Sequence, residues 1–165
     1  MLLANKACAH LARKERLPIV FRVHPSPSQE KLVELWDFLN RAGYPGKGSD
    51  PALLQQVLRQ SQESPLFSTI NTVILRSMQK AVYSSQCEGH YGLGFPDYCH
   101  FTSPIRRYSD LLTHRTLSAY LCGSSLTCDA AEAAQQCTQQ EVNSMLAERV
   151  ADDLLRAQHM RKHLG

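Results

Sequence analysis

The sequence predicts an α+β fold that is predominantly helical, with a few short strands. Apolar residues recur at helical spacing in several stretches, and capping residues precede most of them. The alternation typical of a half-buried strand is clearest in one short stretch, residues 19–23. The chain has 165 residues, 43% of them hydrophobic, which is enough for one domain, or a large piece of one, with a buried core.

A first helix is expected over residues 1–16, and Pro18 ends it. Its apolar side comprises Leu2, Leu3, Ala7 and Leu11. No Ser, Thr, Asp or Asn caps this helix, which is expected if residue 1 lies inside a helix that begins further upstream. In the strand that follows, Arg22 is expected to face outward, and the inward side chains are Ile19, Phe21 and Val23.

Three helices are expected next. Ser26-Pro27, with Gln29 as a capping-box partner, predicts the start of a helix that ends near Arg41, with Gly43 as its stop. Asp50-Pro51 predicts a second helix, and a third is expected over residues 66–82 in the centre of the core. The expected core residues are Leu32, Leu35, Trp36, Leu39, Leu53, Leu54, Val57, Leu58, Phe67, Ile70, Val73, Ile74, Met78 and Ala81. Helical spacing favours core packing of Trp36 over base stacking.

The second half of the chain contains two more predicted helices. Residues 82–103 are expected to be irregular, with a possible short strand at HYGLGF, residues 90–95. A helix over 104–121 is followed by a Ser-rich loop, GSSLT. Asp129 with Glu132 then predicts the capped start of a long final helix that reaches past Leu155.

The helix expected at residue 104 carries unusual charges. Ser103 is expected as its N-cap and Pro104 as its first residue, and its apolar face comprises Ile105, Tyr108, Leu111 and Leu112. The first turn should favour acidic residues because the helix N-terminus is partially positive, yet it holds Arg106 and Arg107. Free N–H groups and two guanidinium groups at one point predict an anion site, most naturally for phosphate. The alternative is a pair of solvated arginines.

The same stretch resembles a known signature. HYGL followed by HFTSPIRRYSDLLTHR, with the spacing between them, is similar to the ribonuclease II/R family of 3′→5′ exoribonucleases. Four further segments follow in the family's order: MLLAN (1–5), LPIVFRVHPSPSQEKL (17–32), LRSMQKAVYS (75–84) and LAERVADDLL (146–155). The resemblance implies that residues 1–165 are the C-terminal half of an RNB-type catalytic domain. It also implies that the upstream half, with its metal-binding aspartates, and the flanking OB-type RNA-binding barrels are absent from this chain.

The resemblance implies roles for three residues. Arg106 would contact the scissile phosphate as the catalytic arginine, Arg107 would hold a neighbouring phosphate or ribose, and Glu148 would contact RNA near the active site. The alternative for Glu148 is a surface glutamate paired with a neighbour.

Four other residues are candidate RNA contacts: Thr102, Ser103, His90 and Tyr98. The Thr102 and Ser103 hydroxyls either cap the helix or bind a phosphate oxygen. Tyr98 either stacks on a base or anchors the loop, and a structural hydrogen bond is the alternative for His90. The Asp110–His114 spacing favours a helix-face pair that also locks the neighbouring arginines, over a metal or acid–base site.

Magnesium is expected only in the complete family enzyme, where a cluster of aspartates holds it. The seven aspartates of this chain are dispersed except for Asp152 and Asp153, which point apart on a helix, so no metal-binding residue is expected here. Six cysteines without a C-x-x-C pair favour free thiols in a reducing cytoplasm.

The predicted function is therefore part of a 3′→5′ exoribonuclease that hydrolyses RNA to nucleoside 5′-monophosphates. This chain would supply the arginine clamp on the RNA 3′-end phosphates and be inactive alone. Its expected partners are the 3′ end of single-stranded RNA and the missing upstream half, with no membrane. The alternative is a non-catalytic RNA-binding or partner-binding remnant of the same fold. A net charge of +3 and a pI of about 8.6 are compatible with both.

Overall fold

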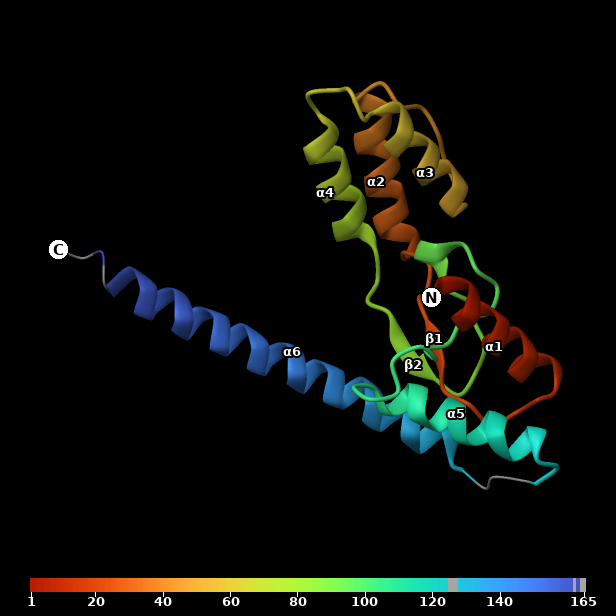
Figure 1. Cartoon of the computed structure of the whole chain (residues 1–165). Coiled ribbons are helices and arrows are strands. Elements are labelled where there is room, and N and C mark those ends of the chain that lie inside the picture. The colour runs from red at the N-terminus through yellow and green to blue at the C-terminus, as the bar shows by residue number, and fades with distance from the viewer. Residues whose placement is uncertain (125–127, 162, 164–165) are drawn as a thin grey trace.

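A computed structural model describes residues 1–124, 128–161 and 163 of the chain. The fold is predominantly helical with one small sheet, as the sequence predicts (Figure 1). The elements in order are α1 (Leu2–Lys14), β1 (Phe21–Val23), α2 (Gln29–Arg41), α3 (Pro51–Gln60), α4 (Phe67–Ser77), β2 (Val82–Ser84), the 3₁₀ helix η1 (Tyr91–Leu93), α5 (Tyr108–Leu121) and α6 (Ala130–Arg161).

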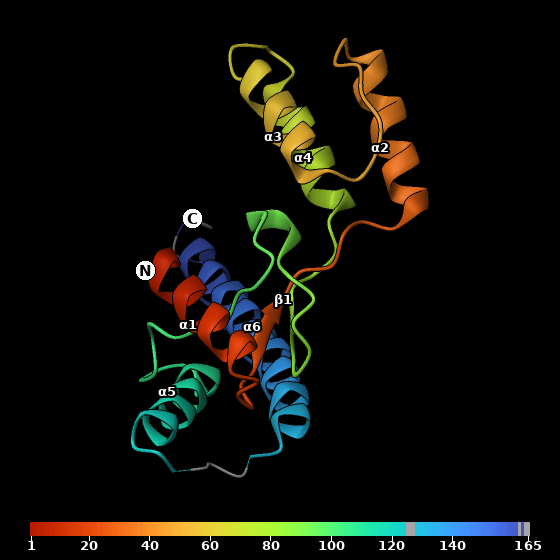
Figure 2. The same ribbon diagram turned by 90° about the vertical axis from the view of Figure 1, so that its right-hand side faces the viewer.

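The molecule has two regions, which Figures 1 and 2 show from two sides. Helices α2, α3 and α4 form a helical trio at one end. The other region, the base, comprises α1, the β1–β2 pair, η1, α5 and the start of α6. The trio is inserted between the two strands in sequence, because β1 leads into α2 and α4 leads back to β2. The strands are antiparallel, with Phe21 opposite Ser84 and Val23 opposite Val82.

The trio has an apolar core of its own. Its buried side chains are Leu35, Trp36, Leu39, Leu54, Val57, Ile70 and Ile74, all of them predicted core positions. Trp36 is 5% exposed, and its Nε1 donates a hydrogen bond of 2.7 Å to the Gly48 carbonyl. The predicted packing role of this tryptophan is therefore confirmed.

Several predicted boundaries are wrong by a few residues. Ser28, not Ser26, caps α2, and its Oγ accepts the Lys31 N–H. Helix α4 ends at Ser77 and lies in the trio rather than at the centre of the molecule, because the chain then extends to pair β2 with β1. The HYGLGF stretch forms η1 instead of a strand.

Helix α1 buries a different side from the one that its leucines indicate. Its buried residues are Asn5, Ala9 and Ala12, whereas Leu2 and Leu3 are 50% and 80% exposed. The small side chains pack against Ile19, Phe21, Val23 and Cys99. The predicted inward orientation of Ile19, Phe21 and Val23 is thus confirmed.

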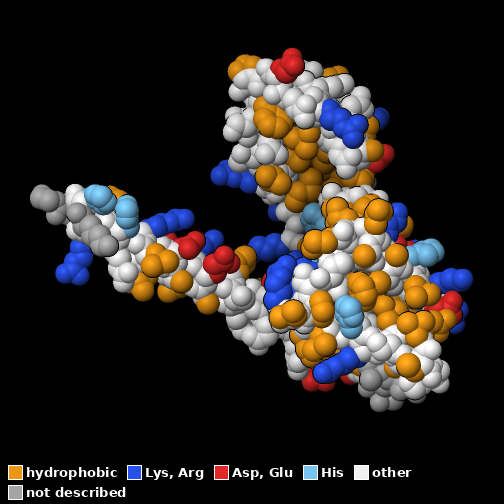
Figure 3. Space-filling view, viewed as in Figure 1, with side chains coloured by type: hydrophobic (Ala, Val, Ile, Leu, Met, Phe, Trp, Pro, Cys, Tyr) orange, Lys and Arg blue, Asp and Glu red, His pale blue; other side chains and the backbone are white. Residues whose placement is uncertain are grey.

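Helix α6 packs only through its beginning. Asp129 caps it as predicted, because its Oδ1 accepts the N–H groups of Ala131 and Glu132. The first turns pack against β2 and α5, and Ala133 and Ala134 are buried there. Every described residue from position 141 onward is exposed, and Figure 3 shows this part as a projecting arm with apolar side chains along it. Among the described helices, none has both the length and the apolar composition of a membrane span.

Candidate functional site

The segment before α5 is a tight turn instead of the predicted first helical turn. Helix α5 begins at Tyr108 with Arg107 in the N-cap position. The N–H groups of Arg106 and Arg107 both donate to the Ser103 carbonyl, at 3.3 and 3.1 Å. Ile105, predicted to face the core, is fully exposed. The predicted helix start at Ser103-Pro104 is therefore wrong, and the reason is a buried carboxylate in the next turn.

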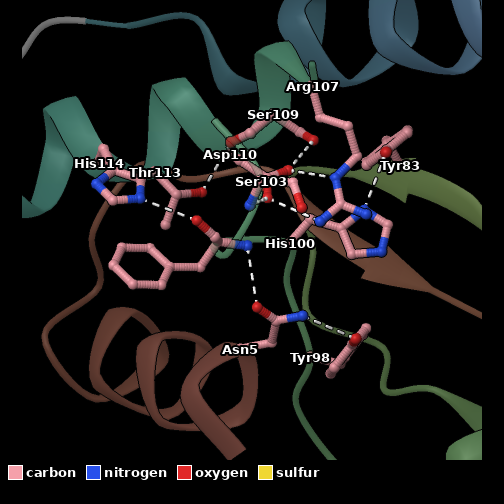
Figure 4. A network of polar contacts seen from close by, with 11 residues as sticks. Asn5, Tyr83, Tyr98, His100, Ser103, Arg107, Ser109, Asp110, Thr113 and His114 are labelled. Atoms are coloured by element: carbon pink, nitrogen blue, oxygen red, sulfur yellow. Dashed lines mark hydrogen bonds and ion pairs between the residues drawn. The ribbon is translucent and has the colours of Figure 1, made fainter. Parts of the chain in front are cut away.

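That carboxylate belongs to Asp110, which is completely buried (Figure 4). Its Oδ1 accepts the Ser103 N–H at 2.7 Å and Arg107 Nη2 at 2.8 Å. Its Oδ2 accepts Arg107 Nε at 2.8 Å and the Ser109 hydroxyl at 3.2 Å. The side chain of Asp110 thus reaches back from the first turn of α5 and fixes the preceding turn, which starts the helix at Tyr108.

The electrostatics of this pair follow from its burial and its hydrogen bonds. Burial alone would raise the pKa of Asp110, but hydrogen bonds from Arg107 and the Ser103 N–H outweigh it and hold that pKa below its usual range. Partial burial opposes the charge of Arg107, and the carboxylate outweighs this as well, so the pKa of Arg107 is raised. Both groups are charged and paired. Of the two arginines expected to be free for an anion, only Arg106 is unpaired among the described residues. The prediction that Asp110 locks a neighbouring arginine is confirmed.

Arg106 is the arginine that stays free. It is exposed and makes no ion pair with any residue that the structure describes. It lies at a groove of about 560 Å³ between the turn and α6. The groove is lined by Tyr83, Arg106, Arg107, Tyr108, Ser109, Cys137, Gln140, Glu141, Ser144, Met145 and Glu148. Three predicted site residues, Arg106, Arg107 and Glu148, therefore meet at one groove although Glu148 is far along the chain.

The other four predicted site residues do not line this groove. Ser103 takes part through its backbone, and the Thr102 hydroxyl is buried without a hydrogen-bond partner among the described residues. Tyr98 is 6% exposed, and its hydroxyl accepts a bond from Asn5 Nδ2, which leaves little surface for a base. The His90 ring packs edge to face on Tyr98. Burial therefore favours the anchoring alternative for Tyr98. The Nδ1 of His90 is buried without a hydrogen-bond partner among the described residues, so the structural hydrogen bond expected for His90 is not supported.

Two residues hold the segment before the turn: Asn5, for which the sequence indicated no role, and His114, which was expected to pair with Asp110. Asn5 Oδ1 on α1 accepts the Phe101 N–H at 3.2 Å. On the opposite side, His114 Nε2 on α5 lies 2.9 Å from the Phe101 carbonyl, and the two rings stack at 4.0 Å. No signal in the sequence indicated Asn5, because the apolar side expected for this helix is the one that carries Leu2 and Leu3, and the structure buries the other side. His114 does not pair with Asp110 as its spacing suggested.

The residues present do not fit a magnesium site. Among the residues that the structure describes, no three His, Cys, Asp or Glu side chains converge closely enough to hold a metal ion. Asp152 and Asp153 are both exposed on the projecting part of α6. All six cysteines are free thiols.

The sequence matches the family model of the RNB domain over residues 1–123. The chain therefore belongs to the RNB domain family of exoribonucleases. It is 42% identical over 124 residues to ribonuclease R of Buchnera aphidicola from Acyrthosiphon pisum, covering 73% of this chain and 17% of that relative. It is 34% identical over 183 residues to ribonuclease R of Vibrio cholerae, covering all of this chain and 22% of that relative. The chain thus spans about a fifth of the length of these curated relatives.

Solved structures with the same fold include a nuclease and a pseudonuclease. The apo form of Mycoplasma genitalium RNase R superposes with a TM-score of 0.85 at 28% identity, covering all of this chain and 28% of that one. The same RNase R in complex with double-stranded RNA gives 0.83 at 29% identity, over 94% and 30%. Yeast Ssd1, a pseudonuclease, gives 0.73 at 25% identity, over 84% and 18%. The fold alone therefore does not decide whether a member is active.

Proposed function

We propose that this chain is part of a 3′→5′ exoribonuclease that hydrolyses RNA to nucleoside 5′-monophosphates, and that it holds the phosphates at the RNA 3′ end. The family and the ribonuclease R relatives support the reaction class. The single observation that carries the role of this chain is the position of Arg106. Among the described residues it is an unpaired guanidinium on a fixed turn, at a groove that Glu148 also lines.

In this proposal, Arg106 stabilises charge that develops during hydrolysis. A guanidinium presents two parallel N–H donors to a phosphate and keeps its charge at any physiological pH. The turn that carries Arg106 is hydrogen bonded to Asp110 through Ser103, so little reorganisation is needed when negative charge grows on the scissile phosphate. A donor fixed in this way acts mainly in the transition state.

Glu148 would contact a different part of the RNA. A carboxylate repels phosphate but accepts hydrogen bonds from ribose hydroxyl groups, which are present only in RNA at the 2′ position. Glu148 and Arg106 line the same groove from α6 and from the turn. The groove therefore offers one side suited to phosphate and one side suited to the sugar. The contacts of Arg107, Ser103, Thr102, His90 and Tyr98 with RNA stay predictions.

Magnesium and the upstream half of the RNB domain complete the enzyme in this proposal. Bound metal would supply the activated water for hydrolysis, and its ligands would come from the upstream half, since the described residues do not form a suitable donor set. The exposed apolar residues of α6, among them Met145, Leu146 and Val150, would pack against that half. Its place of action would be the cytoplasm, where six free thiols stay reduced.

A second candidate is a non-catalytic RNA-binding or partner-binding remnant. The observation that favours it is the likeness to yeast Ssd1, a pseudonuclease with the same fold. The two candidates differ in whether activity returns when the upstream half is supplied.

The test measures nucleotide release from single-stranded RNA labelled at its 3′ end, with magnesium or manganese and with a chelator as control. The chain alone is expected to release nothing. Coexpression with the upstream half of the RNB domain of a ribonuclease R relative is expected to restore metal-dependent release. Metal-dependent release of nucleotides by the pure chain would contradict the proposal that this chain holds only part of the active site. RNA binding without hydrolysis in the reassembled protein would favour the remnant.

Arg106 is tested in the reassembled protein. Arg106→Ala is expected to lower kcat by about 10²–10³, the usual effect of removing one preorganised donor, with a much smaller loss of RNA affinity. Arg106→Lys should also be defective, because an ammonium does not reproduce the two parallel donors. Arg59→Ala, which removes the same charge from α3 in the trio, is the control. An unchanged kcat with a lower Tm would make Arg106 structural.

A further inference from the structure

The two adjacent arginines of the turn lie in very different environments. Arg106 is exposed and has no ion-pair partner among the described residues, whereas the side chain of Arg107 is 21% exposed and paired. We propose that Asp110 is a positioning residue that divides their tasks: it holds Arg107 in a buried ion pair and leaves Arg106 as the arginine that binds an RNA phosphate. This inference rests on the proposed function, and it replaces the phosphate contact that the resemblance implies for Arg107.

The pair occupies one of the two bidentate edges of the Arg107 guanidinium and neutralises its charge. Arg107 uses Nε and one Nη to bind both oxygens of Asp110, each at 2.8 Å. These parallel N–H groups form an edge by which a guanidinium binds phosphate or carboxylate in a bidentate way. While the pair persists, Arg107 cannot present this edge to RNA. The end-on Nη1–Nη2 edge stays unbonded, but the charge behind it is neutralised by Asp110, so Arg107 lies at the groove without a net charge to offer a phosphate.

Asp110 also fixes the backbone from which Arg106 projects. The carboxylate accepts the Ser103 N–H at 2.7 Å, and the Ser103 carbonyl in turn accepts the Arg106 N–H at 3.3 Å. The chain of contacts runs from Asp110 through Ser103 to Arg106. The buried carboxylate thus acts on both arginines, on one through its charge and on the other through the turn.

The charges around the groove lead to the same assignment. Glu141 lines the groove but pairs with Arg22 at 2.6 Å, as Arg107 pairs with Asp110. These two ion pairs are each neutral overall. Among the groove-lining residues that the structure describes, the charges left without a partner are the cation of Arg106 and the anion of Glu148. The groove of this chain therefore offers one phosphate contact.

A count of phosphate contacts can be measured from the salt dependence of RNA binding. For single strands, the slope of log K against log salt concentration is about −0.7 for each phosphate neutralised. Asp110→Asn keeps the shape of the side chain but removes its charge, so Arg107 becomes free to bind a second phosphate. The variant is expected to bind RNA with a slope steeper by about 0.7, although it positions Arg106 less well.

The experiment uses the full chain and a fluorescein-labelled single-stranded RNA, followed by anisotropy over a range of salt concentrations. Arg106→Ala should flatten the slope by about 0.7, and Arg107→Ala should leave it unchanged. The steeper slope of Asp110→Asn should disappear in the double variant Asp110→Asn with Arg107→Ala. Asp37→Asn on α2 makes the same change in net charge and controls for it.

A second measurement does not depend on RNA. In the free chain, the Nε–H proton of Arg107 should exchange slowly with water, as expected for a paired group, and that of Arg106 should exchange fast. NMR of ¹⁵N-labelled protein measures the exchange rates of both Nε–H protons, in the wild type and in folded Asp110→Asn. Fast exchange at Arg107 in the wild type would contradict the inference even if no variant could be prepared.

The outcomes separate this inference from the proposed function. If the wild type binds RNA and Arg107→Ala flattens the slope as much as Arg106→Ala does, the division of tasks is wrong and the proposed function stands. If the wild type and Asp110→Asn show equal slopes, the division of tasks is also wrong and the proposed function again stands. If the wild type shows no salt-dependent RNA binding, the proposed role of this chain is contradicted, and proton exchange alone then decides whether Asp110 holds Arg107.

Discussion

The helical trio and the base are held together by different kinds of contact. The trio buries eight apolar side chains, and its two buried polar residues, Ser61 and Ser77, bond to carbonyls of their own helices. The base buries polar side chains that join elements, such as Asn5, or fix a turn, such as Asp110. Apolar packing is not directional, whereas hydrogen bonds fix the angle of a backbone. The polar network lies where the proposed function requires a turn of fixed geometry.

The two regions meet at His24 and Gln79, at the points where the chain enters and leaves the trio. His24 Nε2 lies 2.8 Å from the Gln79 carbonyl, and Gln79 Nε2 donates to the Ser26 carbonyl at 2.6 Å. Trp36, the only tryptophan, lies in the trio, so its fluorescence reports that region. Far-UV circular dichroism reports the helical content of the trio and of the base together. The two signals together show whether a change in one region destabilises the other.

The largest effect is expected in the base, from Asp110→Ala. The substitution leaves the mostly buried charge of Arg107 and the Ser103 N–H without their partner. Removal of one member of a buried ion pair typically costs about 3–5 kcal/mol, and we expect about 4 kcal/mol of the free energy of unfolding to be lost. Urea denaturation followed by circular dichroism measures it. A loss below about 1 kcal/mol would show that the network contributes little.

A somewhat smaller effect is expected in the trio, from Leu39→Ala. Leu39 is fully buried, and truncation of such a leucine removes apolar contacts and leaves a cavity. We expect a loss of about 3 kcal/mol, with the Trp36 fluorescence transition moving to lower urea. Val33→Ala, on the exposed side of α2, should change stability by no more than about 0.5 kcal/mol. Equal effects of the two variants would contradict the assigned core.

Asn5→Ala should destabilise the base by an intermediate amount. It removes two hydrogen bonds and leaves the Phe101 N–H without its acceptor in a partly buried position. The expected loss is about 2 kcal/mol, seen by circular dichroism. Leu3→Ala on the exposed side of α1 is the matched control. If the leucine variant is the more damaging one, the described burial of α1 is wrong.

The smallest effect concerns pH, and it should be confined to the base. Burial, with the charges of His24 and Arg22, lowers the pKa of His90 to about 4. Burial, with the charges of Arg107 and Arg22, lowers the pKa of His100 to about 4. In the unfolded chain both would take up protons below about 6.5, so stability is complete above that pH and falls as the pH drops towards 4.

We therefore expect the Tm to be a few degrees lower at pH 5 than at pH 7. Replacement of His100 by Asn should reduce this dependence on pH. Helices α2, α3 and α4 contain no histidine, so the Trp36 signal should depend on pH less than the circular dichroism signal does. A Tm that rises on acidification would contradict the direction of both pKa shifts.

Much of the trio and several helix ends could be predicted from the sequence. The apolar spacing of Leu35 and Leu39, and the caps Asp50 and Asp129, were predicted correctly. These features depend on residues that are close in sequence, because helical periodicity and N-capping act within one or two turns. The motif around Arg106 also indicated the family, because a signature of consecutive residues requires no knowledge of tertiary contacts.

Which arginine is free, and where α5 begins, could not be predicted from local patterns, because both depend on the burial of Asp110. Local rules favoured a helix start at Ser103, but the buried carboxylate of Asp110 takes the Ser103 N–H and the Arg107 side chain for itself. The return of α6 places Glu148 at the groove beside Arg106, and no local pattern contains that contact. The several hydrogen bonds of a buried carboxylate outweigh a capping preference of about 1 kcal/mol, so the sequence identified the residues of the site and the fold selected which of them face the groove.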